Sequence, residues 1–189
     1  MSNFPSIPNS LLPPAETLDT GSVSSSTASE QFLRLHLVPE TTALLPMRQL
    51  TEVLSIPIGQ IVPIPHMPAW TIGVYNWRGE ILWMLDLGHL IGLTPWYQQG
   101  SGTSNHSVVV LNAHNPNTNS TNSKSQMLGL VVNRVEDLEW CDRDLIQSPL
   151  SSNVNAELVP FLRGYWLKPN GEMLVVLDGE AIIAAMANW

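Results

Sequence analysis

The stretch from Gly73 to Leu87, GVYNWRGEILWMLDL, most constrains what this chain can fold into, because it predicts two strands that turn back on each other. Asn76 and Gly79 are the expected turn residues, since asparagine tolerates a positive φ and glycine adopts one without steric cost. Arg78 then lies at the rigid tip of a hairpin, with the aromatic face of Trp77 beside it. Arginine and tryptophan are frequent in binding hot spots, so this tip is predicted to contact another protein.

Short strands are predicted along most of the remaining chain. Alternating or β-branched apolar runs indicate strands at residues 31–38, 41–45, 107–112, 127–132, 158–167 and 172–177, with a short or edge strand at 61–64. The continuous apolar run 173–177 implies burial on both faces, as where two barrels meet. The predicted fold class is therefore mostly β, with a barrel architecture.

Three small helices complete the prediction. Apolar residues recur at helical spacing from Pro46 onward, which indicates a short amphipathic helix. They are Met47, Leu50, Val53 and Leu54. Asp86 and Asp178 each precede an apolar stretch, as the N-cap residue of a helix does. Capping is the expected role of Asp86, in preference to chemistry.

The two least apolar segments are expected to lie outside the folded core. Residues 1–29 are dominated by serine, threonine, proline and asparagine and are predicted to form a disordered tail. Residues 112–125 form an Asn/Ser-rich insert between two strands, expected to be a long surface loop. The folded domain is expected to span residues 30–189. The acidic residues between 136 and 144 are interpreted as a solvated edge, since their spacing lacks the glycine and terminal glutamate of a calcium loop.

Composition excludes several classes of function. The formal net charge is −8 with eight basic residues, which removes the electrostatic attraction that dominates nucleic-acid binding. The single cysteine, Cys141, permits no internal disulfide and no cysteine-based zinc site. No basic leader and no run of about eighteen apolar residues is present, so we expect a cytoplasmic protein without direct membrane insertion. Seven tryptophans and 44% hydrophobic residues favour a protein that works in a complex.

The sequence gives no indication of catalysis, of a cofactor or of a metal. Its glycines match neither the phosphate-loop nor the dinucleotide pattern, and its five histidines lack zinc-site spacing. Cys141 lies beside acidic residues, which disfavour the reactive thiolate.

The hairpin stretch carries a resemblance to a known family. Gly73, Asn76, Arg78, Gly79 and the segment 84–87 resemble the signature of CheW-like domains, adaptors that couple chemoreceptors to the CheA histidine kinase. The resemblance covers nearly all of the chain that is expected to fold. It implies two five-stranded SH3-like barrels packed together.

Other segments extend this resemblance outward. Leu50, Glu52 and Val53 are similar to the family's apolar-x-Glu-apolar segment, residues 129–135 to its Gly-apolar-apolar-Val-x-x-Val strand, and residues 174–178 to its closing strand and helix start. The implied function is that of a non-catalytic scaffold, recruited to receptor arrays at the membrane. It would bind methyl-accepting chemoreceptors on one surface and a CheA-type histidine kinase on another, for chemotaxis, phototaxis or pilus-driven motility.

Carried over residue by residue, the resemblance assigns protein binding to the neighbourhood of Leu50, Glu52, Gly73, Asn76, Trp77, Arg78 and Gly79. Gly73 and Gly79 are expected to be backbone requirements, and Arg78 is expected to make the energetic contact. For these two residues a purely structural explanation fits as well as a binding role: Leu50 as part of the core and Glu52 as a solvent-exposed residue.

Two other classes of function stay open on the sequence. A small-ligand-binding barrel would need a pocket lined by converging polar groups. An unrecognised enzyme would need a cleft with strongly perturbed titratable groups.

Overall fold

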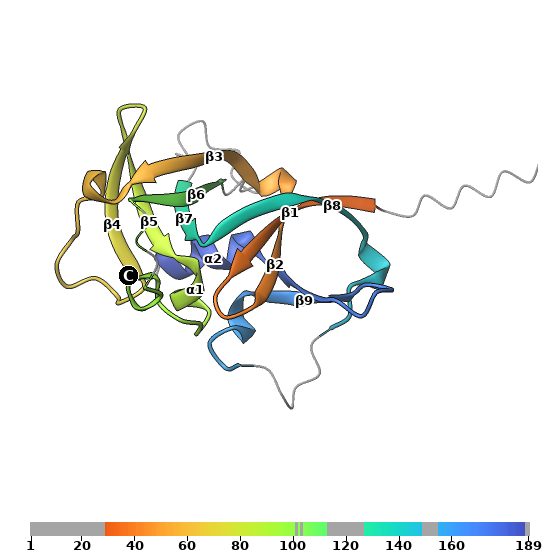
Figure 1. Cartoon of the computed structure of the whole chain (residues 1–189). Coiled ribbons are helices and arrows are strands. Elements are labelled where there is room, and N and C mark those ends of the chain that lie inside the picture. Colours follow the sequence, from red (N-terminus) through yellow and green to blue (C-terminus); the bar gives the residue numbers. More distant parts are fainter. Residues whose placement is uncertain (1–28, 101, 103, 113–126, 149–154, 188–189) are drawn as a thin grey trace, which may run out of the picture.

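A computed structural model describes residues 29–100, 102, 104–112, 127–148 and 155–187 (Figure 1). These residues contain ten strands in two five-stranded sheets, two α-helices and five short 3-10 helices. The predicted tail and insert lie outside the described residues, apart from Ser29 and Asn112, which belong to strands. No helix among the described residues is long and apolar enough to cross a membrane.

The first sheet combines the two ends of the chain, and the second takes its middle. The first has the order β8-β1-β2-β10-β9. Its strands are β1 (Ser29–Leu37), β2 (Thr41–Pro46), β8 (Arg134–Asp142), β9 (Leu162–Leu167) and β10 (Met173–Leu177). The second has the order β3-β6-β7-β5-β4. Its strands are β3 (Leu50–Pro57), β4 (Thr71–Trp77), β5 (Glu80–Asp86), β6 (Asn105–Asn112) and β7 (Met127–Val132).

The two sheets are built on the same plan. Reading across each order, the pairings are antiparallel, antiparallel, parallel and antiparallel, with β2–β10 and β5–β7 as the parallel pairs. In both sheets a hairpin, β4–β5 or β9–β10, leads into a helix, α1 (Leu87–Leu90) or α2 (Gly179–Ala187). The first sheet is therefore a circularly permuted copy of the second. Its strands follow the plan of the second sheet when they are read from β8 through β9 and β10 to β1 and β2.

Both predicted helix caps are confirmed. The Asp86 side chain accepts a hydrogen bond from the His89 backbone N–H at 3.2 Å, and Asp178 accepts one from Glu180 at 2.9 Å. Each carboxylate satisfies an N–H group that the first turn of its helix leaves without a partner.

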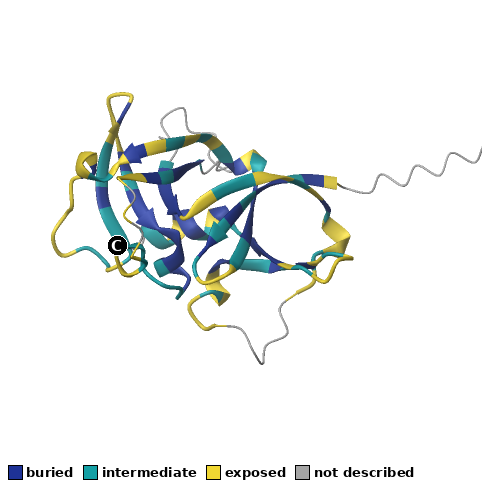
Figure 2. Ribbon diagram, viewed as in Figure 1, coloured by how far each residue is buried: buried dark blue, intermediate teal, exposed yellow. Residues whose placement is uncertain are grey.

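The apolar core has three parts, because successive strand residues point to opposite faces. In β6, Val108 and Val110 fill the interior of the second sheet, whereas Val109 and Leu111 pack into a larger cluster shared by both sheets. In β10, the pair Leu174 and Val176 fills the first sheet's interior. Figure 2 shows the buried residues running along the strands in the middle of the molecule. The prediction that the last strand is buried on both faces is confirmed from Leu174 onward.

The predicted helix from Pro46 is wrong. A single 3-10 turn, η1 (Met47–Gln49), is followed by strand β3, in which Thr51 and Val53 are exposed while Leu54 is half-buried. The spacing of apolar residues there fits a half-buried strand as well as a helix, and pairing with β6 decides between them.

Two predicted strands are shorter than expected. The segment 158–167 begins with the 3-10 helix η5 (Val159–Phe161), because Pro160 cannot donate a ladder hydrogen bond, and β9 starts at Leu162. In the segment 61–64, an isolated bridge joins Val62 to Val74. The remaining 3-10 helices are η2 (Ile58–Gln60), η3 (Trp96–Gln98) and η4 (Arg143–Leu145).

Candidate functional site

The β4–β5 hairpin ends in a two-residue turn made by Arg78 and Gly79, and its tip projects beyond the rest of the molecule (Figure 1). Both turn residues have positive φ, 54° and 86°, as a type I′ turn requires. Asn76 was predicted to be a turn residue, and this is wrong for its backbone, which belongs to β4. It contributes through its side chain, whose oxygen accepts a hydrogen bond from the Gly79 N–H at 3.0 Å.

Three side chains form the hairpin-tip cluster: Glu52, Trp77 and Arg78. The Glu52 carboxylate accepts hydrogen bonds from Trp77 Nε1 at 3.2 Å and from Arg78 Nη2 at 2.8 Å. Glu52 lies on β3 and Trp77 on β4, which are opposite ends of the strand order. The contact therefore closes the second sheet into a barrel and fixes the base of the tip.

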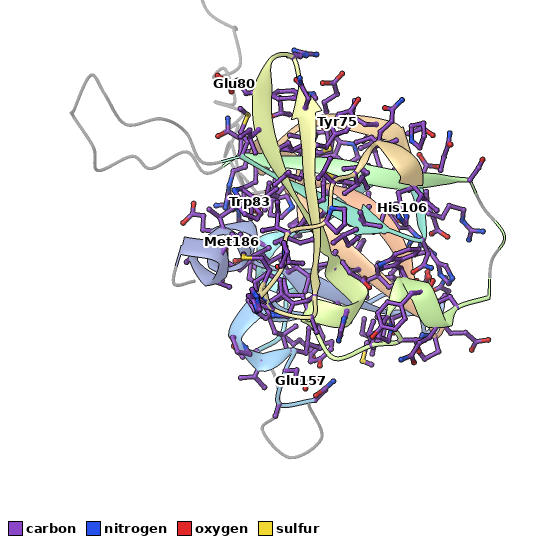
Figure 3. The ribbon with its side chains drawn as sticks, turned by 90° about the vertical axis from the view of Figure 1, so that its left-hand side faces the viewer. Tyr75, Glu80, Trp83, His106, Glu157 and Met186 are labelled. Atoms are coloured by element: carbon purple, nitrogen blue, oxygen red, sulfur yellow. The ribbon has the colours of Figure 1, made fainter. Side chains whose placement is uncertain are left out.

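The hairpin-tip cluster presents a cation on a fixed platform. The Trp77 ring is buried in the barrel interior, and the Arg78 guanidinium lies 4.8 Å from the ring centroid. The Arg78 side chain is 67% exposed, so most of it faces solvent despite the ion pair. Figure 3 views the hairpin from the side, with Tyr75 and Glu80 on its two strands. A guanidinium held in this way is suited to pair with a carboxylate of another protein.

The other predicted residues have different surroundings. Leu50 is half-buried against the core shared by both sheets. Gly73 lies outside the cluster, and a Cβ placed there would be 2.2 Å from the Val62 carbonyl oxygen, so only glycine fits. Gly79 has open space around it and is required for its positive φ alone.

Sequence reasoning missed two exposed apolar side chains near the cluster. Ile81 is paired with Asn76 beside the turn, and Val53 follows Glu52 on β3; both are largely exposed. The signal for Ile81 was present, because strand alternation places it on the face opposite the buried Leu82.

The prediction that the acidic segment is solvated is wrong for two of its residues. Glu136 and Glu139 of β8 pair with Arg34 of β1 at 2.6 and 3.2 Å, and Arg34 also pairs with Glu172 at 2.5 Å. These partners are more than a hundred residues apart in sequence from Arg34, which is why the local charge pattern concealed the network.

A cleft of about 480 Å³ lies where the two sheets meet, lined in part by Asp86, Trp96 and His106. Burial raises the pKa of the Asp86 carboxyl, although backbone hydrogen bonds from Trp96 and His89 oppose that effect. Burial also lowers the pKa of His106. Both Asp86 oxygens are occupied, one by His89 N–H and one by Trp96 N–H, so the carboxylate anchors the helix start and the following loop.

The polar side chains that line this cleft also include His36, Asn105 and Asn133. The interiors of both barrels are filled by the apolar clusters described above. No group of three or more histidine, cysteine, aspartate or glutamate side chains within the described ranges is arranged to hold a metal ion.

Comparison with known proteins identifies the family. Residues 31–187 match the family described as the CheW-like domain. The chain belongs to this family. CheW-family proteins are non-catalytic, and this chain is a member of the family.

Individual CheW proteins are similar to this chain over about two thirds of its length. The chemotaxis protein CheW of Rhizobium meliloti (strain 1021) is 29% identical over 122 residues, covering 64% of this chain and 67% of that protein. A probable chemotaxis protein CheW of Rhizobium etli is 27% identical over 123 residues, covering 64% and 68%. The crystal structure of the scaffolding protein TtCheW from Thermoanaerobacter tengcongensis superposes with a TM-score of 0.61 at 19% identity, covering 79% of this chain and 88% of that one. The predicted fold of two five-stranded units is confirmed.

Proposed function

We propose that this CheW-like protein couples methyl-accepting chemoreceptors to a CheA-type histidine kinase, in the cytoplasm at membrane-associated receptor arrays. Family membership and the similarity to proteins named chemotaxis protein CheW support this role. The observation that carries it is the hairpin-tip cluster, in which an exposed arginine is oriented by a buried tryptophan and a glutamate.

Such a protein acts by fixing the relative position of its two partners. A scaffold that holds two partners in fixed register lets a change in one bias the state of the other, as a coupling free energy through two interfaces. A pre-oriented arginine suits this task, because less side-chain freedom is lost when the partner binds. The same coupling step serves chemotaxis, phototaxis or pilus-driven motility, and the proposal covers all three.

The proposed site comprises Leu50, Glu52, Gly73, Asn76, Trp77, Arg78 and Gly79. Arg78 makes the contact with the partner, and Glu52 and Trp77 orient it. The remaining residues shape the backbone and the base of the hairpin, as their close packing and turn geometry support.

Arg78→Ala tests the proposal. We expect the variant to fold and to bind receptor fragment or kinase about 30-fold more weakly, the equivalent of the ~2 kcal/mol of a hot-spot arginine. Affinities would be measured by titration of each partner, and ternary assembly by co-sedimentation with receptor and kinase.

Arg134→Ala is the matched control. The Arg134 side chain is 65% exposed, close to the value for Arg78, and like Arg78 it forms an ion pair with a glutamate, Glu136, at 2.6 Å. It lies on the other sheet. Undiminished ternary assembly by Arg78→Ala, or an equal loss in both variants, would refute the assignment of the tip.

A further inference from the structure

Three arginines converge on one buried carboxylate at the start of the first sheet. Glu30 of β1 is 8% exposed, and its Oε2 accepts hydrogen bonds from Arg143 Nε at 2.8 Å and Arg163 Nη1 at 3.0 Å. Arg48 Nη1 lies 2.7 Å from Oε1, an ion pair without hydrogen-bond alignment. Three of the eight basic residues of an acidic chain are thus gathered around a single acid.

Closure of the barrel accounts for part of this arrangement. Arg143 follows β8 and Arg163 lies on β9, which are the two ends of the first sheet's order, and Glu30 joins them. One guanidinium balances the charge of one carboxylate. The half-buried Arg163 already balances that charge. The more exposed Arg48 and Arg143 therefore add positive charge beyond what one carboxylate neutralises, although Arg143 also takes part in closure.

The geometry leaves this surplus charge on a surface hollow. Arg48 and Arg143 are 52% and 43% exposed, and they line a hollow of about 480 Å³ together with Ser29, Glu30, Gln31 and Met47. In the described part of the chain, Arg143 contacts Glu30 through its Nε atom, and Arg48 contacts Glu30 through its Nη1 atom. Each guanidinium therefore keeps further N–H donors for an anion.

The charge of Glu30 is fixed by the same contacts. Burial alone would raise the pKa of its carboxyl, but the hydrogen bond from Arg143 and the charges of Arg163 and Arg48 outweigh burial and hold the pKa below its usual value. The hollow consequently keeps two guanidiniums against one carboxylate at neutral pH.

Exposed apolar residues lie next to these arginines. Leu145 is two residues after Arg143, and Trp140 of β8 is paired with Gln31, which lines the hollow; both side chains are largely exposed. Arginine beside exposed tryptophan and leucine is typical of a surface that binds protein, because the charge orients a segment and the apolar area holds it.

We propose that the hollow flanked by Arg48 and Arg143 is a docking site for an acidic segment of a partner protein, with carboxylates on the arginines and apolar side chains on Trp140 and Leu145. It lies on the first sheet, whereas the hairpin-tip cluster lies on the second. The two surfaces can therefore engage different segments at once. This proposal stands independently of the coupling role proposed above.

Fluorescence anisotropy with a labelled peptide of alternating glutamate and leucine tests the site on the full chain. We expect Arg48→Gln and Arg143→Gln each to weaken binding several-fold and the double variant to weaken it at least about tenfold, with a shallower salt dependence. Arg134→Gln removes the same charge elsewhere on the first sheet, and it should leave the affinity within about twofold of the unaltered chain.

Two results would overturn the proposal. One is equal weakening by Arg48→Gln, Arg143→Gln and the control Arg134→Gln, which would mean attraction to overall charge. The other is equal competition by inorganic phosphate and by an unlabelled peptide of the same charge, which would mean a small-anion site. Should the double variant fold poorly, nuclear magnetic resonance of the arginine Nε–H groups in the unaltered chain decides: the Arg48 and Arg143 signals shift on peptide addition if the site is right and stay fixed if it is wrong. Receptor and kinase are absent from these measurements, so failure here leaves the coupling role untouched.

Discussion

Replacement of Arg34 by methionine would test how far a charge network stabilises the first barrel. Arg34 lies on β1, with Glu136 and Glu139 of β8 on one side and Glu172, just before β10, on the other. Methionine keeps an unbranched apolar stem of similar reach but removes the guanidinium. The substitution therefore isolates the contribution of the charge from that of packing.

The magnitude follows from the burial of the network. The Arg34 side chain is 21% exposed, and its three glutamates are similarly covered. Exposed ion pairs contribute about 0–1 kcal/mol, whereas removal of one partner of a fully buried pair costs about 3–5 kcal/mol. Loss of the three ion pairs of Arg34, at this degree of burial, should lower the free energy of unfolding by about 3 kcal/mol. For a domain of this size, such a loss lowers Tm by about 6–12 °C.

Urea unfolding followed by tryptophan fluorescence measures the loss directly, as a lower midpoint with an unchanged slope. Acidification gives a second readout. Hydrogen bonds from Arg134 and Arg34 hold the pKa of Glu136 below its ordinary 4.5. The native state thus binds fewer protons than the unfolded state near that pH, and the stabilisation is complete above pH 4.5 and lost below it. The gap between wild type and Arg34→Met should narrow as the pH falls from 6 to 3.

The control is Arg134→Met, which removes a largely exposed partner of the same Glu136. It should cost less than about 1 kcal/mol. The double variant Arg34→Met/Glu172→Gln should recover part of the loss, because it relieves repulsion among carboxylates left together. A loss below about 1 kcal/mol for Arg34→Met, with no change in the gap across this pH range, would refute the reasoning.

Two further variants or reagents test packing. Gly164→Ala should lower the free energy of unfolding in urea by about 2–3 kcal/mol, because its Cβ would lie 2.5 Å from the Gln147 backbone oxygen. Gly59→Ala is the control, and with open space around it the change should stay within about 0.5 kcal/mol. Equal effects would contradict the packing of β9. Cys141 is fully buried, and burial, aided by the charge of Asp142, raises the pKa of its thiol to about 11. A thiol reagent at pH 8 should label it only after unfolding, and rapid labelling of the native protein would show that the interior of the first barrel is open.

The central strands were predictable because the apolar pattern that identifies each of them lies within the strand itself. The runs 107–112 and 127–132 are apolar on both faces, and both became strands that separate a barrel interior from the shared core. Asp86 and Asp178 were likewise predictable as caps, since a capping residue binds the backbone a few positions away.

Edge segments and long-range charges were not predictable in this way. Residues 47–54 satisfy both a helical and a strand pattern, and the choice of strand comes from pairing with β6 at a distant point in the chain. The position of Arg78 at the hairpin tip was predicted correctly from Gly79 and the apolar runs on either side, although Asn76 belongs to the strand. That Glu52 orients Arg78 was not deducible, because contact across 26 residues depends on the sheet closing into a barrel.

The shared plan of the two sheets links stability to binding. In each barrel a carboxylate joins the two ends of the strand order: Glu52 receives Trp77 and Arg78 in the second, and Glu30 receives Arg143 and Arg163 in the first. The guanidiniums at these closures include the exposed ones that we propose as contacts. Truncation of the acid should therefore weaken binding through disorder of the arginine, whereas truncation of the arginine removes the contact itself. Because Glu52 acts through Arg78, its replacement costs little further binding once Arg78 is gone, so the loss in Glu52→Gln/Arg78→Ala should be smaller than the sum of the single losses.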